Sequence, residues 1–321
     1  MSDYSKKIST LRDLINSRLG SVYPVGPSML KDPINHVLSG RGKRLRPILT
    51  LIASELNSTP VEAVMPAALS IELLHNFTLI HDDIMDQDLI RHGLKTVHNK
   101  WDGNTAILSG DAMLAVSMKL LSENSYENKA MILGTFIKGL LSVCEGQALD
   151  IEFEGNVDVS LDDYINMIYL KTAYMIGLSA QIGGMVSNLS NEECDLLRKY
   201  GESIGLAYQV QDDILELYSN PKIMSKNLDS DILLKKKTFV WASIDSKDDR
   251  NELDAMMRGY ANNKSRTIND IKNFIARLDI KDKADEFILK HINIANDMLL
   301  NLNGDISLLK YFSDLILRRK K

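Results

Sequence analysis

The sequence predicts an all-α protein, and two observations support that prediction. Six of the seven prolines lie at or before Pro66 and the seventh is Pro221, so residues 67–220 lack the strongest helix breaker. Within that stretch apolar residues recur at helical spacing, and no segment alternates apolar and polar residues convincingly beyond four or five positions. Aromatic residues make up only 6% of the chain, which also favours helices over strands.

Clusters of glycine, asparagine, serine and aspartate predict where the helices end. They lie at residues 39–42, 102–104, 122–128, 154–156, 187–193 and 218–230. The segments between them are about 12–30 residues long, as in helical bundles. Composition does not change at any of these breaks, so we expect one domain spanning residues 1–321.

Composition and charge narrow the class of protein. Apolar residues make up 45% and charged residues 25% of the 321 residues, as in globular proteins, and a net charge of −5 disfavours nucleic-acid binding. Cys144 and Cys194 are too few for a disulfide framework or a structural zinc site. The N-terminus has no apolar signal segment. The longest uncharged stretch, residues 172–191, contains polar residues and three glycines, so we expect a buried helix, no transmembrane segment and a soluble, cytoplasmic protein.

An acidic motif, Asp82-Asp83-Ile84-Met85-Asp86, follows an uncharged run in what the sequence predicts to be the middle of a buried helix. Asp82 and Asp86 project from one face a turn apart, and such like charges destabilise a helix by about 0.2–0.5 kcal/mol. Buried carboxylates need a counter-charge, and Mg²⁺ is a natural one for oxygen ligands. A solvated acidic patch is the alternative interpretation of this motif alone.

The same arrangement recurs about 130 residues later as Asp212-Asp213-Ile214-Leu215-Glu216. Two such clusters can face each other across a bundle and hold several Mg²⁺ ions. Mg²⁺ prefers one or two protein carboxylates together with waters and substrate phosphates. The two motifs therefore predict a phosphate or diphosphate substrate.

Basic residues that suit a diphosphate accompany both motifs. Three cations lie in the glycine-flanked turn Gly42-Lys43-Arg44-Leu45-Arg46-Pro47, which leads into an apolar helix. His75 lies within about 20° of the helical stripe of Asp82, so we expect it to face the same site, with a core histidine as the alternative. Taken singly, each of the remaining cations is better explained as a surface residue: Arg91, Lys171, Lys226, Lys235, Lys236 and Lys237.

The order and spacing of these motifs resemble the trans-isoprenyl diphosphate synthase (polyprenyl synthetase) family. The resemblance extends from Gly42 to Thr238. It rests on residues 42–47, the first acidic motif with Arg91 and Gly93, residues 105–111, Glu145-Gly146-Gln147 with Asp150, Lys171-Thr172, residues 209–216, and residues 230–232 with Lys236 and Thr238.

The resemblance implies a single-domain isoprenoid synthase-type helical bundle around a deep cavity, usually a homodimer. It implies a prenyltransferase that condenses isopentenyl diphosphate with an allylic diphosphate (dimethylallyl, geranyl or farnesyl) into an all-trans chain, without a side-chain general base. A medium- or long-chain synthase, a class I terpene cyclase and a non-catalytic regulatory subunit are the alternatives. The cation set around Lys43 argues against the cyclase, which needs no isopentenyl diphosphate site.

The resemblance also implies a role for each matching residue. Asp82, Asp86 and Asp212 would bind three Mg²⁺ ions, and the predicted metal set also includes Asp83, Asp213 and Glu216. The allylic diphosphate would be held by Arg91, Lys171, Lys226 and Lys236. Isopentenyl diphosphate would be bound by Lys43, Arg46, His75 and His92. Thr172 and Gln209 would lie beside the allylic cation, and Phe77 and Thr78 would form part of the cavity floor and favour a short product, farnesyl (C15) or geranylgeranyl (C20) diphosphate.

Three positions depart from the usual pattern of the family. Glu216 stands where aspartate is common, and its longer side chain is expected to reach a metal through water. His92 replaces a frequent arginine; because an unperturbed histidine has a pKa of about 6.5, we expect the Michaelis constant for isopentenyl diphosphate to rise between about pH 6 and 8. Leu234 and Lys235 replace a frequent Glu-Gly, which leaves open which of Lys235, Lys236 and Lys237 contacts phosphate.

Overall fold

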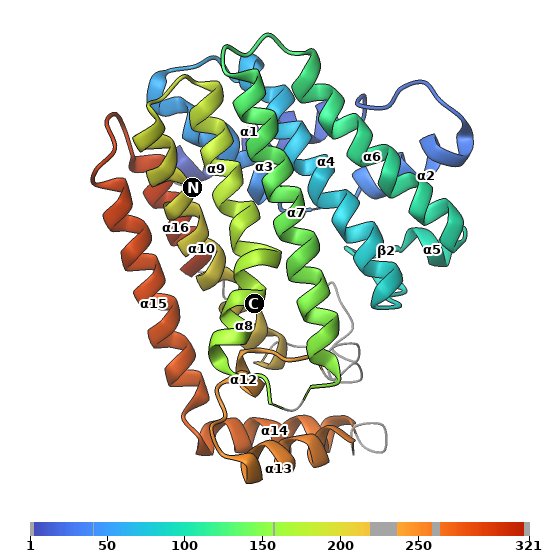
Figure 1. Cartoon of the computed structure of the whole chain (residues 1–321), viewed down its shortest axis with the longest axis vertical. Helices are drawn as coiled ribbons and strands as arrows, with labels where there is room; N and C mark the ends of the chain where they lie inside the picture. The colour runs from blue at the N-terminus through green and yellow to red at the C-terminus, as the bar shows by residue number, and fades with distance from the viewer. Residues whose placement is uncertain (1–2, 41, 157, 219–235, 259–263, 318–321) are drawn as a thin grey trace.

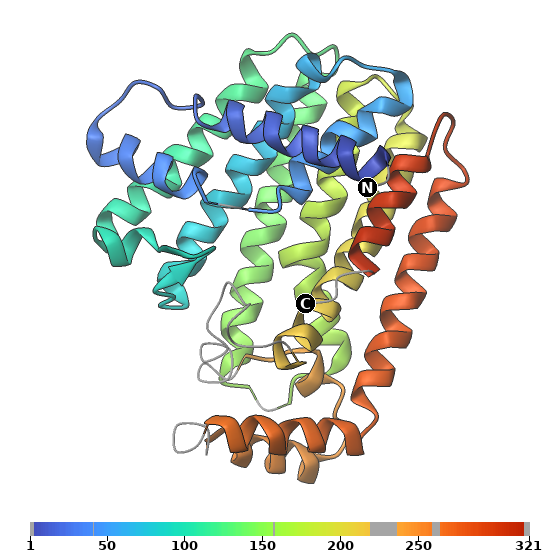
Figure 2. The same cartoon turned by 180° about the vertical axis from the view of Figure 1, so that it is seen from behind.

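The computed structural model describes residues 3–40, 42–156, 158–218, 236–258 and 264–317. In these residues the chain folds into a layered bundle of helices with one short antiparallel ribbon, shown from two sides in Figures 1 and 2. The predicted all-α class is confirmed. Helices α13 and α14 form a hairpin that crosses the lower end of the bundle.

The first half of the chain forms the layer that carries the first acidic motif. Its elements are α1 (Asp3–Leu19), α2 (Ser28–Leu38), α3 (Leu45–Ser54), a 3₁₀ turn (Glu55–Asn57), α4 (Val61–Met85), β1 (Ile90–Arg91), β2 (Leu94–Lys95), α5 (Val97–Lys100) and α6 (Gly103–Glu123). The α4 helix packs against α3 and α6, and α3 packs against α9.

The second half carries the second acidic motif. Its elements are α7 (Lys129–Glu154), α8 (Leu161–Ile168), a π-helical segment (Tyr169–Ala173), α9 (Tyr174–Val186), α10 (Asn191–Tyr218), α12 (Phe239–Ala242), α13 (Lys247–Arg258), α14 (Lys264–Arg277), α15 (Ile280–Leu299) and α16 (Ser307–Leu317). The α10 helix lies between α9 and α15. The five predicted helix breaks between residues 39 and 193 overlap loops between these helices, and the sixth, at residues 218–230, lies outside the described residues except for its first position.

Most of the uncharged stretch 172–191 is buried inside the protein, as predicted, and its last four residues reach the surface. Its helix, α9, is only 13 residues long, and all of its residues except Tyr174 and Gln181 are buried. Three other helices, α4, α6 and α7, are long and apolar enough to cross a membrane. The most apolar window of α4 is 72% buried within the chain, whereas those of α6 and α7 are only 39% and 33% buried.

Three local features were not expected from the sequence. The α4 helix begins at Val61 and contains Pro66, so this proline is not a boundary. A two-stranded ribbon follows α4, and its turn residues His92 and Gly93 both have positive φ (51° and 79°), as a type I′ turn requires. The helical path from α8 to α9 widens into a π-helical segment, a feature that often marks functional sites.

Candidate active site

The first acidic motif lies at the C-terminal end of α4, and the expectation that it lies in the middle of a helix is wrong. The helix ends at Met85, and Asp86 caps it with its N–H donating to the carbonyl of Asp82 over 2.8 Å. The two carboxylates therefore keep their one-turn spacing. Because the helix dipole is negative at this end, both acids lie where cations are most needed.

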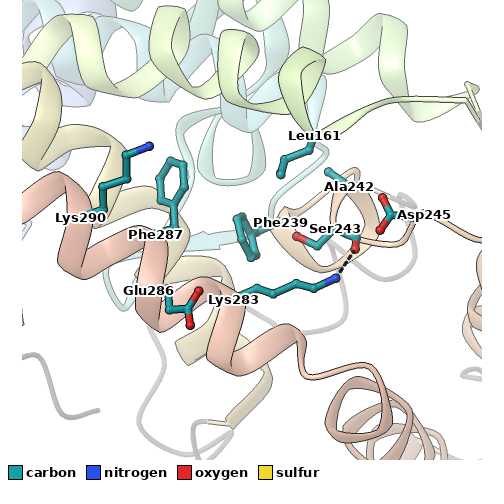
Figure 3. A pocket seen from close by; sticks show the side chains of 9 residues that line it. All are labelled: Leu161, Phe239, Ala242, Ser243, Asp245, Lys283, Glu286, Phe287 and Lys290. Carbon is teal, nitrogen blue, oxygen red and sulfur yellow. Dashed lines mark hydrogen bonds between the residues drawn. The ribbon is translucent and has the colours of Figure 1, made fainter.

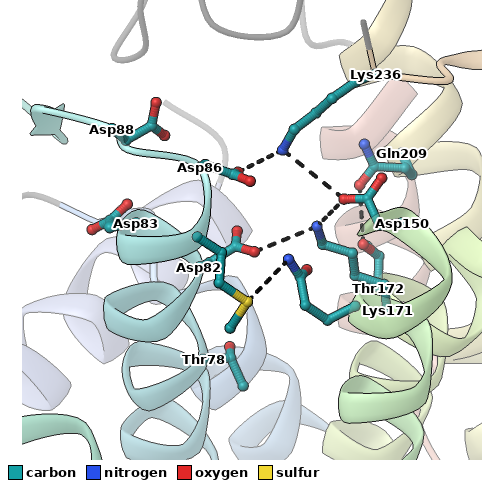
Figure 4. A network of polar contacts seen from close by, with 12 residues as sticks. Thr78, Asp82, Asp83, Asp86, Asp88, Asp150, Lys171, Thr172, Gln209 and Lys236 are labelled. Atoms are coloured by element: carbon teal, nitrogen blue, oxygen red, sulfur yellow. Dashed lines mark hydrogen bonds and ion pairs between the residues drawn. The ribbon is translucent and has the colours of Figure 1, made fainter. Parts of the chain in front are cut away.

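Two lysines from other segments supply positive charge to these acids (Figure 4). The Nζ of Lys171 lies 3.5 Å from Asp82, and the Nζ of Lys236 lies 2.5 Å from Asp86. Both lysines also approach Asp150 of α7, at 2.5 and 3.9 Å. Burial lowers the pKa of Lys171, but Asp82 and Asp150 outweigh it, so the pKa is raised and the lysine is a cation at neutral pH.

The carboxylate of Asp86 is under electrostatic strain despite its lysine partner. Burial is the largest cause of its raised pKa, the charge of Asp82 adds to it, and Lys236 only partly opposes it. This pair of acids is therefore not fully neutralised by the protein. The arrangement favours an additional cation at this position.

The π-helical segment joins the two acidic helices. Its Lys171 reaches Asp82 of α4, while the next residue, Thr172, donates its hydroxyl to Oε1 of Gln209 on α10 over 3.0 Å. Gly146 of α7 lies against this segment: a Cβ there would be 2.3 Å from the nitrogen of Lys171. Glycine is thus required for α7 to approach the segment that carries both residues.

A second connection runs through the residues that precede α12. Lys236 reaches Asp86 of the first motif, and the N–H of Phe239 donates to Asp213 of the second over 2.8 Å. Lys237 stacks over the ring of Trp241 at 3.9 Å, so among the two described lysines it is Lys236 that faces the acids. The predicted site residues Lys226 and Lys235, and the side chain of Glu216, lie outside the described part of the chain.

The paired aspartates of the first motif point in different directions. Figure 4 shows Asp82 and Asp86 directed toward the lysines and Asp83 directed to the other side of α4. Asp83 pairs with Arg91 of the ribbon, which also contacts Asp88 at 3.1 Å. Burial raises the pKa of Asp83 to about 6, although Arg91 opposes the shift.

The second aspartate of the other motif is also occupied by protein groups. The carboxylate of Asp213 accepts hydrogen bonds from Tyr164, Phe239 and Gln209, and burial raises its pKa to about 6. The metal-ligand prediction for Asp83 and Asp213 does not fit these surroundings, because each carboxylate is directed at protein donors. Both residues instead hold other site residues in place.

A second basic cluster lies around α3 and α4. Nη1 of Arg46 lies 3.1 Å from Nε2 of His75, and burial followed by the charge of Arg46 lowers the pKa of His75 well below its usual range. His75 is therefore neutral, and its Nε2 accepts from Arg46. Lys43 and His92 are exposed, and the charges of His92 and Arg91 also act on His75.

Two cations of the Gly42–Pro47 turn differ sharply in role. Arg44 is buried against Glu72 at 2.7 Å and also donates to the carbonyls of Leu38 and Gly40, so it anchors the turn. Arg46 instead keeps its buried Nε without a hydrogen-bond partner within the described residues. A buried, unsatisfied donor on a cation is suited to an anionic ligand.

Comparison with known proteins places this arrangement in a family. The polyprenyl synthetase family profile matches residues 27–278, more than half of the chain. The chain belongs to the polyprenyl synthetase family. A short chain isoprenyl diphosphate synthase of Methanocaldococcus jannaschii is 41% identical over 206 residues, which cover 64% of this chain and 63% of that protein.

Two further comparisons extend over most of the chain. A geranylgeranyl diphosphate synthase of Saccharolobus solfataricus is 32% identical over 90% of this chain and 85% of its own length. The crystal structure of a geranylgeranyl pyrophosphate synthetase from Pyrococcus horikoshii superposes with a TM-score of 0.90 at 30% identity, covering 99% of both chains. The sequence comparisons and the structural comparison therefore indicate the same family.

Several contributors to this polyprenyl synthetase site have no role that the sequence alone predicts. In the sequence, Asp150 stands out only as part of a motif, yet in the structure it contacts both Lys171 and Lys236. Glu154, whose pKa is raised by burial and which lies near Lys236, gives no sequence signal, and neither does Tyr164, which binds Asp213. Only Gly146 and Asp150 carry a usable signal, since both belong to the motif Glu145-Gly-Gln147 with Asp150.

A separate pocket lies behind the second acidic motif, between α8, α12 and α15 (Figure 3). Its volume is about 380 Å³. Its lining combines apolar rings with two lysines and two acids: Leu161, Phe239, Ala242, Ser243, Asp245, Lys283, Glu286, Phe287 and Lys290. Its equal numbers of lysines and acids make it unlike the acid-rich surroundings of Lys171 and Lys236.

Proposed function

We propose that this chain is a trans-prenyltransferase that joins isopentenyl diphosphate to an allylic diphosphate, in a single domain spanning residues 1–321. The observation that carries the proposal is the presence of two separate anion sites. Lys171 and Lys236 face the leading acids of the first motif, while Arg46 and His75 form a basic cluster with no acidic motif of its own. Two diphosphates bound in two different ways would match these sites.

The donor set of the acidic motifs fits Mg²⁺. Within the described residues no three acidic, histidine or cysteine side chains converge to enclose one ion. Mg²⁺ does not need such a cage, because it commonly takes one or two carboxylates and completes its shell with water and phosphate oxygens. Asp82, Asp86 and Asp212 would hold it, and bound Mg²⁺ would neutralise charge on the departing diphosphate.

The chain's own residues would then assist each bond change. The allylic C–O bond breaks and its electron pair leaves with the diphosphate, which Lys171 and Lys236 stabilise as cations. Thr172 and Gln209 present oxygen atoms to the positive allylic carbon. The double bond of isopentenyl diphosphate attacks that carbon, and the proton lost afterwards goes to the released diphosphate.

The second substrate would be held by the basic cluster. Arg46 offers its unsatisfied Nε and its charge, and neutral His75 orients its Nη1. Lys43 and His92 are exposed, and we assign them to the outer phosphate of this substrate. This assignment needs no metal ion at the second site, and it distinguishes the chain from a cyclase.

The direct test is incorporation of labelled isopentenyl diphosphate by the purified protein with Mg²⁺ and each allylic primer in turn. We expect an extractable product of geranylgeranyl (C20) length, matching the names of several relatives. A product much longer than C20 would support a long-chain synthase instead. No incorporation with any primer would leave the non-catalytic subunit as the better interpretation.

Product length should depend on Phe77. This residue precedes Asp82 by five positions, about 7.5 Å along α4, and its ring, 9% exposed, packs edge-on against His81 at 4.8 Å. Thr78 donates its hydroxyl to the carbonyl of His75. Phe77→Ala should open the floor and lengthen the product by at least one isoprene unit, read by chromatography.

The matched control is Phe287→Ala on α15, which removes a phenyl ring from the separate pocket. It should leave the product length unchanged. An unaltered product from Phe77→Ala, with normal turnover, would show that this ring does not limit the chain.

We also propose that two copies of the chain pair through α6 and α7. These helices leave large apolar side chains exposed: Ile107, Leu108, Met131, Ile137, Leu141 and Ile151. Exposed apolar side chains that gather on two neighbouring helices favour an interaction site. Lys138 and Glu145 are exposed on the same stretch of α7, which favours a protein partner and a soluble protein over lipid, since charges in a bilayer are costly.

Sedimentation of the purified protein should give twice the mass of one chain. Leu141→Arg should yield monomers, because Leu141 is 58% exposed in the single chain yet would be buried in the pair. Leu289→Arg, at an equally exposed leucine on α15 (55%), should leave the dimer intact. A monomeric native protein, or one that pellets with vesicles, would contradict the pairing.

A further inference from the structure

Asp213 of α10 is a buried carboxylate that connects three helices of the chain, α8, α10 and α12. One oxygen, Oδ2, accepts hydrogen bonds from the hydroxyl of Tyr164 over 2.6 Å and from the N–H of Phe239 over 2.8 Å. The other oxygen, Oδ1, accepts from Nε2 of Gln209 over 3.0 Å. Asp213 itself is 8% exposed. All three contacts are donors, as an ionised carboxylate requires.

This arrangement determines which way the amide of Gln209 points. An amide has one donating and one accepting end, and only the donating end can face an ionised carboxylate. With its NH₂ group held by Asp213, Gln209 must turn Oε1 the other way. There Oε1 accepts the hydroxyl of Thr172 at 3.0 Å, next to Lys171 at the acidic site.

We propose that Asp213 is a positioning residue that orients the amide of Gln209 so that its carbonyl oxygen faces the allylic carbon during ionisation. Tyr164 and the backbone of Phe239 hold Asp213 in this role. The inference rests on the proposed function and deepens it. It also gives the two aspartates of the motif different roles: Asp212 would bind Mg²⁺, and Asp213 would orient the amide that faces the reacting carbon.

The chemical reason is the charge that develops on carbon. When the C–O bond breaks, the electron pair leaves with the diphosphate and the allylic carbon becomes positive. A carbonyl oxygen fixed beside it before the reaction stabilises that charge without rearrangement. A reversed amide would present N–H groups, whose positive ends would raise the barrier.

Exchanging the two side chains tests this orientation. In Asp213→Asn the oxygen of the new amide stays with Tyr164 and Phe239, so its NH₂ group faces Gln209 and forces that amide to reverse. Every hydrogen bond can still form, so the variant is expected to fold. We expect kcat to fall by about 100-fold, with little change in the Michaelis constant for isopentenyl diphosphate.

Gln209→Glu alone should also lose activity, because two carboxylates would then face each other at the 3.0 Å contact. The double variant Asp213→Asn/Gln209→Glu restores a donor opposite an acceptor and returns an oxygen to Thr172. We expect its kcat to lie within about tenfold of the wild type. A merely structural role, or a role as metal ligand, predicts no such rescue.

Two further measurements make the outcome decisive. The Mg²⁺ concentration for half-maximal rate should be unchanged in Asp213→Asn, and an increase would overturn the proposal. Nuclear Overhauser effects between the Gln209 amide protons and the Thr172 methyl group should be stronger in Asp213→Asn than in the wild type. This readout needs no turnover, so an inactive wild-type protein would refute the proposed function alone, whereas an unchanged amide contact would refute the orientation.

Discussion

Replacing Asp86 by asparagine is expected to lower kcat at least about 100-fold while leaving the protein folded. Asparagine keeps the shape of the side chain but removes the charge that faces Lys236 at 2.5 Å and would hold Mg²⁺. Loss of one preorganised electrostatic contact typically has an effect of this size. The half-maximal Mg²⁺ concentration should rise as well. Labelled isopentenyl diphosphate incorporation and a Mg²⁺ titration measure both effects.

The same variant should not lose thermal stability, in contrast to its loss of activity. The folded pKa of Asp86 is raised, chiefly by burial and by Asp82, so its ionised form costs stability at any pH above the unfolded value of about 4. Removing that charge should leave the melting temperature without Mg²⁺ unchanged or higher. The charge of Asp86 would thus raise the rate of the reaction while lowering the stability of the protein without Mg²⁺.

The control is Asp285→Asn on α15, where an exposed aspartate pairs with Lys281 on the surface. Such a pair contributes little, so neither activity nor melting temperature should change appreciably. Turnover of Asp86→Asn near the wild-type rate, with an unchanged need for Mg²⁺, would show that Asp86 is not a ligand.

The second large effect is expected at Gly146, a residue that has no side chain of its own to take part in the reaction. In Gly146→Ala the new Cβ would lie 2.3 Å from the nitrogen and 2.7 Å from the Cα of Lys171. These are backbone atoms, so the π-helical segment must shift to relieve the overlap. We expect a loss of about 1–3 kcal/mol in the free energy of unfolding, together with a fall in kcat of about 100-fold as Lys171 and Thr172 leave their positions.

Gly155→Ala is the matched control at the end of the same helix. A Cβ there meets nothing within 4 Å, and the backbone already has helical angles (φ −86°, ψ −10°). This variant should keep full activity and gain up to about 1 kcal/mol of stability. Denaturant unfolding and turnover measure both variants. If Gly146→Ala behaved like Gly155→Ala, close packing of α7 against Lys171 would not be needed.

The sequence by itself determined the fold class, most helix boundaries and the chemistry of the site. Proline-free helical periodicity, breaks such as the capping residue Asp102, and two acidic motifs are local properties that need no knowledge of packing. The order of motifs also sufficed to predict the family, which the comparisons confirmed. Residue types and their spacing were therefore enough to predict the class of reaction.

Adjacent residues of identical type could not be separated in the same way. Asp82 and Asp83 differ by 100° on one helix, and only the packing of α4 decides which of them faces Lys171 and which faces Arg91. Likewise, Lys237 packs over the ring of Trp241, whereas Lys236 faces the acids of the first motif. These choices depend on contacts with segments up to 150 residues away, which no local pattern records.

The tertiary structure also decided the features with the least sequence signal. The π-helical segment exists where α7 approaches it at Gly146, and Asp213 acquires its role from Tyr164 and Phe239, which come from two other helices. Burial makes these contacts decisive, because a buried carboxylate must find donors and a close backbone approach excludes any Cβ. The sequence thus specified which groups take part, and packing specified where each one points.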